Sequence, residues 1–240
     1  MHAAERTECR APSAAESQAG ERVQRALQQA VSGPVTALGW TLQNQKADGG
    51  SPDVANDANP KRPLMRCWTI YDAKFELGAG SPHYAALHAQ ADKWQKDEQD
   101  WMAACIKSNY KGCDKKPDNL TLGAHAAAGL NLEIRALENS PYMRPPSTEP
   151  LHKLDVPGAA VAYRLQPDEE DLVKTTVCVG SWKPEITFAS ASREVLFPFQ
   201  HAPGTPFIEN LCLTITGAPD LSDELLHKVD WQQLSAALTR

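Results

Sequence analysis

Apolar side chains recur at helical spacing most clearly between residues 82 and 108. They fall three, four or seven positions apart there, and Lys96, Asp97 and Asp100 occupy the opposite side. That spacing predicts one long amphipathic helix that starts at Pro82 and turns one apolar face inward. The residues expected to face inward are Tyr84, Leu87, Ala91, Trp94, Trp101, Met102, Cys105 and Ile106.

Three further segments carry a helical pattern, namely residues 13–31, 120–138 and 220–238. We expect the first helix to stop at Gly33 and Pro34, because both residues interrupt helical backbone. The residues expected to face inward are Val23, Leu27 and Ala30 in the first helix, Leu130, Ile134 and Leu137 in the second, and Leu221, Leu225, Val229, Leu234 and Leu238 in the third.

Alternation of apolar and polar residues predicts strands. In residues 35–42 the better apolar face holds Leu38, Trp40 and Leu42, so Trp40 is expected in the core. Residues 64–77 alternate as a central strand would. Most strands of the second half are separated by Pro or Gly turns, which is typical of an antiparallel meander. They are expected over residues 158–165, 171–182, 185–189, 194–199 and 207–217.

Together these patterns predict an α+β fold, in which an antiparallel sheet of about six to seven strands packs with three to four helices. We expect a mobile N-terminal lead over residues 1–12 and a single domain over residues 13–240. The prolines between residues 140 and 156 leave open a subdivision into a helix-rich part, 13–140, and a strand-rich part, 157–240.

The chain contains six cysteines, although a chain of 240 residues can bury a sufficient core without disulfides. The cysteines are therefore informative about the compartment in which the protein folds. Their even number favours disulfides and an oxidising compartment, and none forms a CxxC pair or has zinc-site spacing. Unpaired, buried cysteines that act as small apolar side chains are the alternative.

Spacing favours particular disulfide pairs. Cys113 follows Cys105 closely, so this pair is expected to close the end of the long helix. Cys178 and Cys212 each lie in the middle of a predicted strand, and neighbouring strands would bring their Cβ atoms within bridging distance.

The two remaining cysteines, Cys9 and Cys67, are paired by elimination, which is one of several connectivities that six cysteines allow. Disulfides would make this an exported, periplasmic protein. We then expect a signal, a lipid anchor or a membrane helix to precede residue 1. The Ala-rich composition favours a bacterial source.

Charge and hydropathy restrict the partners. The formal net charge is −6, and no block of Lys or Arg is present to neutralise phosphates, which disfavours nucleic acids and anionic membranes. No stretch approaches the roughly 18 apolar residues of a membrane span, so we expect no membrane insertion of this segment. A basic protein partner, such as a toxin or an enzyme, fits the charge better.

Two acidic segments are candidate partner-binding surfaces. Residues 43–63 contain several Gly and Pro residues and predict a long surface loop, a kind of loop that is often functional. Its acidic residues do not have the spacing of a calcium loop. The candidate residues are Asp48, Asp53, Asn56 and Asp57 in the loop, and Asp168, Glu169, Glu170 and Asp171 in a turn between strands.

Motifs of catalysis are missing from the sequence. It contains no nucleophile elbow, phosphate loop, dinucleotide fingerprint or HExxH zinc helix. We therefore predict no catalytic residue, no metal ligand and no cofactor. A hydrolase remains the alternative if Asp72, Glu76, His125 or His201 meet only in the folded chain.

These observations predict a non-catalytic, exported protein-binding domain. An inhibitor or immunity-type protein that neutralises a secreted enzyme or toxin fits these observations best. The properties of the chain are similar to those of periplasmic immunity proteins, although no residue motif carries the resemblance. The alternatives are the hydrolase and an accessory or ligand-binding envelope protein.

Overall fold

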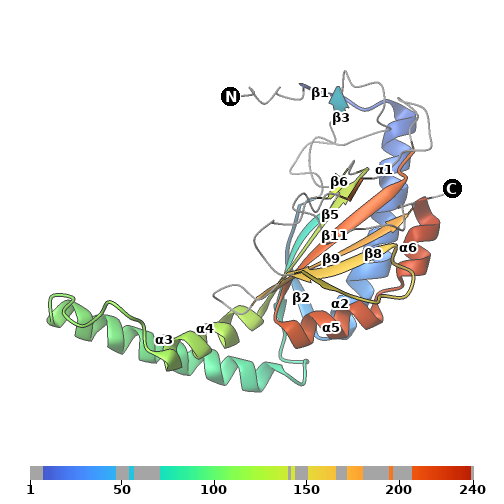
Figure 1. The fold of residues 1–240 in the computed structure, drawn as a ribbon. Coiled ribbons are helices and arrows are strands. Elements are labelled where there is room, and N and C mark those ends of the chain that lie inside the picture. The colour runs from blue at the N-terminus through green and yellow to red at the C-terminus, as the bar shows by residue number, and fades with distance from the viewer. Residues whose placement is uncertain are drawn as a thin grey trace.

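A seven-stranded antiparallel sheet with helices on one face forms the body of the molecule (Figure 1). The computed structural model describes residues 8–46, 54–56, 71–139, 142–143, 151–165, 172–180, 195–196 and 207–238. The predicted α+β class and antiparallel sheet are confirmed. From edge to edge the strands are β2 (Trp40–Lys46), β4 (Tyr71–Leu77), β5 (Asn131–Glu138), β11 (Asn210–Gly217), β9 (Val173–Gly180), β8 (Val161–Leu165) and β7 (Leu151–Lys153). Two short antiparallel pairs accompany the sheet, β1 (Glu8–Arg10) with β3 (Val54–Asn56), and β6 (Tyr142–Met143) with β10 (Val195–Leu196).

Strand β11 joins the two parts of the chain, because it is hydrogen-bonded to β5 on one side and to β9 on the other. Leu213 of β11 lies opposite Ala136 of β5 and Val177 of β9, and all three side chains are fully buried. Since alternate residues of a strand share a face, these strands present one continuous apolar surface. Strands from before and after the proline-rich connection therefore share one sheet and one core.

Helices from both ends of the chain cover this apolar surface. They are α1 (Ala14–Leu27), the π-helical turn η1 (Gln28–Ser32), α2 (Gly33–Ala37), α5 (Pro219–Lys228) and α6 (Trp231–Leu238). Val23 and Leu27 of α1 are fully buried, as the helical spacing predicts, and α6 packs on α1, β9 and β11. The helical layer thus closes the core from one side.

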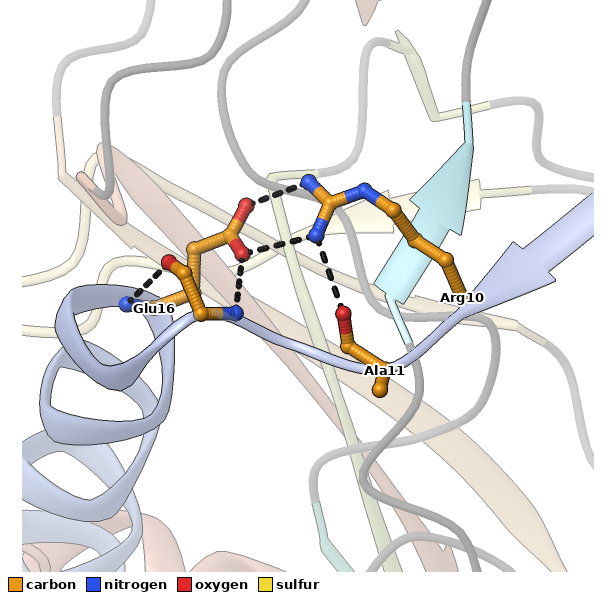
Figure 2. A network of polar contacts seen from close by, with 4 residues as sticks. Arg10, Ala11 and Glu16 are labelled. Carbon is orange, nitrogen blue, oxygen red and sulfur yellow. Dashed lines mark hydrogen bonds and ion pairs between the residues drawn. The ribbon is translucent and has the colours of Figure 1, made fainter.

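The start of α1 holds the N-terminal strand in place (Figure 2). Arg10 donates hydrogen bonds to both carboxylate oxygens of Glu16, at 2.9 and 2.7 Å. Glu16 also accepts from the Ser13 amide, and the Ser13 hydroxyl accepts from the Glu16 amide, which makes a capping box. The hydrogen bonds from Arg10 lower the pKa of Glu16 to about 2. Residues 8–10, predicted to belong to a mobile lead, form strand β1 instead.

The strand predicted over residues 35–42 is wrong in its first half. Pro34 follows the π-helical turn η1 within one continuous helical run from Ala14 to Ala37, so helical backbone continues past it. Gly39, with φ at 87°, then turns the chain into β2. Trp40 is buried as predicted, but Leu42 is 46% exposed, because it lies on the edge strand beside a β-bulge.

The helix predicted over residues 120–138 is correct only in its first half. Helix α4 (Asp118–Gly129) is followed directly by β5. Ile134 is buried as predicted, although in a strand, whereas Leu137 lies on the other face and is 48% exposed. Pairing with β4 and β11 overrides the helical spacing of the apolar residues in this segment.

The single helix predicted over residues 220–238 consists of α5 and α6. Val229 leaves helical backbone, and the Asp230 side chain accepts from the Gln233 amide at 2.8 Å, which caps the second helix. The proline-rich connection, predicted to be irregular, contributes β7 at the sheet edge. The five apolar residues predicted to face inward are all buried: Leu221, Leu225, Val229, Leu234 and Leu238.

Two predicted disulfides are confirmed. Cys105 and Cys113 are joined with 5.9 Å between their Cα atoms. Cys178 and Cys212 are joined directly across β9 and β11, where they lie opposite each other at a Cα–Cα distance of 4.1 Å. Cys9 lies in β1, but its predicted partner is outside the described residues, so that pairing stays a prediction.

Candidate functional site

Helices α3 (Tyr84–Lys107) and α4 form an arm, residues 84–129, that extends away from the sheet (Figure 1). Helix α3 packs mainly on α4. Although α3 is 24 residues long, Cys105 is its one buried residue. The arm therefore adds surface rather than core to the molecule.

Polar contacts brace the arm along its length. Lys93 forms an ion pair with Asp97 four residues later on α3. Lys116, just before α4, places its Nζ 2.6 Å from Glu98 Oε1 and 5.6 Å from the centre of the Trp94 ring. These last contacts connect the two sides of the arm, because Glu98 and Trp94 both belong to α3.

The arm tip, residues 102–113, has a backbone shape fixed by several constraints. The chain turns through Asn109 and Tyr110 at φ values of 53° and 61°, which non-glycine residues rarely adopt. The Tyr110 amide donates a hydrogen bond to the Cys105 carbonyl oxygen at 2.7 Å. The disulfide between Cys105 and Cys113 closes the same turn covalently. The side chains of the tip are therefore presented on a preformed support.

Three large apolar side chains are exposed at the arm tip. Met102, Ile106 and Tyr110 are 43%, 61% and 60% exposed. Met102 and Ile106 are four residues apart, so they lie on the same side of α3. A group of exposed apolar side chains at the end of a projecting element is the feature of this molecule most typical of a contact surface.

Charge at the arm tip is opposite in sign to that of the whole chain. Residues 102–113 contain two lysines and no acidic residue, whereas the formal net charge of the chain is −6. Lys107 and Lys111 are exposed beside the apolar side chains. The arm tip thus combines an apolar centre with a positively charged surround.

The partner-binding residues predicted from sequence fall almost entirely outside the described residues. Asp48, Asp53, Asp57 and the turn 168–171 are outside them, and of Asn56 the structure gives only its place at the end of β3. Both predicted surfaces therefore stay predictions.

The residues of the hydrolase alternative are only partly described. Asp72 and Glu76 lie on the sheet face away from the helices, where Asp72 Oδ2 is 3.6 Å from Arg135 Nε. His201 is outside the described residues, as is the side chain of His125 in α4. These positions stay predictions.

Two other histidines approach carboxylates. His83 Nε2 lies 3.2 Å from Glu224, and His88 Nδ1 lies 2.9 Å from Asp92. The side chains of both pairs are more than 40% exposed, so water screens them and neither pair is enclosed in a pocket.

Metal-binding side chains do not gather in the described part of the chain, where no group of three or more His, Cys, Asp and Glu residues could hold an ion. Of the helices that the structure describes, none is both long and apolar enough to span a bilayer.

Sequence reasoning missed the arm tip, because apolar spacing alone places Met102 and Ile106 on the inward face of the long helix. A signal was present in the finer spacing. At 100° per residue, Trp101 and Cys105 lie within about 20° of Trp94, whereas Met102 and Ile106 are rotated from it by about 80° and 120°. The helix therefore carries a stripe that faces α4 and a second apolar patch beside it.

Neither the models of known protein families nor the curated proteins nor the solved structures contain a match to this chain.

Proposed function

We propose that this chain is an exported, non-catalytic protein-binding domain that docks through the tip of its arm. We place it among inhibitors or immunity-type proteins, which neutralise a secreted enzyme or toxin. The observation that carries the proposal is the disulfide-closed arm tip, with Met102, Ile106 and Tyr110 exposed at its end.

Residue types at the arm tip support protein binding. Met and Tyr are enriched where proteins meet, because they supply a large contact area, and Tyr adds a polar group. The preformed turn also reduces the entropy lost on binding, since its backbone is already held by the Tyr110 amide and by the disulfide.

The shape of the arm supports an inhibitory role. Helix α3 has 24 residues and is therefore about 36 Å long, which is enough to carry the tip into a cleft while the body stays outside. The exposed lysines beside the apolar centre favour a recess whose floor is apolar and whose rim carries carboxylates.

The decisive experiment measures the affinity of matched variants for a purified partner. A photo-crosslinking residue at position 106 first identifies the protein that contacts the arm tip. The dissociation constant is then measured for the wild type, for Ile106→Asp combined with Tyr110→Ser, and for Leu42→Asp. Leu42 is a suitable control because it is 46% exposed but lies on β2, outside the arm.

We expect the tip variant to bind at least about 100-fold more weakly, since two exposed anchors are lost, and the Leu42 variant to bind within about threefold of the wild type. An enzymatic partner should be inhibited by the wild type and not by the tip variant. Equal binding of the tip variant and the wild type would overturn the proposal. So would tip-dependent binding to vesicles of anionic lipid with no protein partner, which would make the arm a membrane-contacting element.

A further inference from the structure

A hollow of about 490 Å³ lies on the surface between α1 and α6, in the body of the molecule. Its polar wall consists of Arg22, Arg25 and Gln29 from α1 and η1 and Gln233 from α6. This volume is within the range of small-ligand sites in proteins. The hollow is separate from the arm, which extends away from the other side of the body (Figure 1).

The two arginines of the hollow lack ionic partners among the described residues. Arg22 and Arg25 are three residues apart, so their guanidinium groups lie on the same side of α1. Neither forms an ion pair with any residue of the described chain. Arg22 Nε is itself buried and donates to no acceptor in that part of the chain. A buried donor without an acceptor costs free energy, and a change in the Arg22 side chain that turns this donor towards an oxyanion in the hollow would remove the cost.

The rest of the lining is apolar. Ala26 of α1 and Ala236 and Ala237 of α6 contribute methyl groups, which offer contact to a small hydrocarbon group but no hydrogen bond from their side chains. The amides of Gln29 and Gln233 can donate to further oxygens of a bound ligand.

From these features we propose that the hollow binds a small molecule that carries a carboxylate or phosphate group on a short apolar body. The guanidinium groups of Arg22 and Arg25 bind the oxyanion through their terminal nitrogens, which offer paired donors to such groups. The apolar body lies over the three alanines. This site is independent of docking by the arm, so either proposal can fail without the other.

The experiment titrates the whole protein with inorganic phosphate, acetate, butyrate and butylphosphonate, with sodium chloride at equal ionic strength as the salt control. Binding is followed by NMR of the arginine Nε–Hε groups and by the shift in thermal unfolding temperature. The variants are Arg22→Gln with Arg25→Gln, the corresponding double change to Lys, and Lys153→Gln with Lys174→Gln. The last pair removes the same charge from exposed positions on β7 and β9.

We expect saturable shifts of the Arg22 Nε–Hε signal, with butyrate and butylphosphonate binding more tightly than acetate and phosphate. The Gln variant should bind at least about tenfold more weakly, the Lys variant should fall between it and the wild type, and the Lys153 and Lys174 variant should bind normally. Comparison of butyrate with butylphosphonate decides between a carboxylate and a phosphate ligand.

Several results would overturn the proposal. One is a response to all four anions no larger than the response to chloride. Another is an equal loss of binding in the Lys153 and Lys174 variant, which would show a nonspecific charge effect. If the Gln variant does not fold, the Lys variant decides alone, because full affinity with lysine at both positions would exclude the paired guanidinium contact.

Discussion

The body and the arm of this protein are held together by different means. In the body, alternate residues of the strands and the facing stripes of α1, α5 and α6 are almost completely buried. In the arm, α3 buries one residue of 24, and ion pairs, a cation–π contact and a disulfide at the tip supplement a small apolar contact in which Leu120 and Ala126 of α4 are buried. Most side chains of α3 therefore lie at the surface, where they are accessible to a partner.

The largest expected difference between body and arm is the loss of stability when an apolar side chain is truncated to alanine. Leu213→Ala in β11 should lower the free energy of unfolding by about 2 to 5 kcal/mol, because it removes a fully buried side chain at the centre of the sheet. Ile106→Ala at the arm tip should change it by less than about 0.5 kcal/mol, because that side chain is 61% exposed. Urea unfolding followed by circular dichroism measures both. Equal losses in the two variants would mean that the arm is as tightly packed as the body.

Removal of each disulfide should destabilise a different part of the molecule and by a different free energy. Replacing Cys178 and Cys212 by Ala opens a loop with a sequence separation of 34. In the chain-entropy model this lowers the free energy of unfolding by about 4 kcal/mol, and the loss should affect the whole body. Replacing Cys105 and Cys113 opens a loop with a separation of 8, worth about 2 to 3 kcal/mol, and the loss should be confined to the arm.

Hydrogen exchange distinguishes these two outcomes residue by residue. The arm variant should exchange faster over residues 100–118 while β5, β9 and β11 keep their protection. Faster exchange throughout the sheet in that variant would show that arm and body unfold as one unit.

The smallest expected effect is the loss of stability at acidic pH that protonation of Glu16 causes in the body. The pKa of Glu16 is about 2 in the folded protein and lies below its ordinary value of 4.5, so folding favours the charged form. The resulting stabilisation is present above about pH 4.5 and is lost as the pH falls towards 2. Its size is on the order of 2 kcal/mol, since half-exposed Arg10 is partly screened by water.

Glu16→Gln tests this by urea unfolding at a series of pH values. The variant should be less stable than the wild type near pH 6, and the two should converge towards pH 2, where the carboxyl group becomes protonated. A difference that stays constant with pH would show that the Arg10 contact is not ionic in origin.

Sequence pattern predicts best the elements whose spacing agrees with their packing. The buried face of β4, with Tyr71, Ala73 and Phe75, follows from alternation. The extent of the long helix ending near Lys107 also follows from periodicity, although its expected inward face buries only Cys105. The segment at Ile134 is harder, because its apolar residues satisfy both a helical and an alternating pattern and only pairing with β4 and β11 decides between them. Pro34 is misleading as a helix stop, since the π-helical turn η1 leads into it and helical backbone continues to Ala37.

The candidate sites are less predictable than the elements. The spacing rotates Ile106 away from the stripe that faces α4, but the exposure of its side chain also depends on the direction of the arm, which the spacing does not give. The hollow beside Arg22 and Arg25 forms only because α6, from the far end of the chain, packs along α1. In contrast, Cys178 and Cys212 can be paired from sequence, since each lies mid-strand in a predicted meander.

The position of β11 has a consequence for when the protein can fold. Its residues, 210–217, are synthesised after both β5 and β9, yet they fill the middle of the sheet between these two strands. Until they are available, β5 and β9 each lack one of their two neighbouring strands, and Cys178 has no Cys212 to join. The nascent chain therefore cannot complete the sheet of its body until β11 has been synthesised, so pairing between distant parts of the chain limits how soon folding can finish.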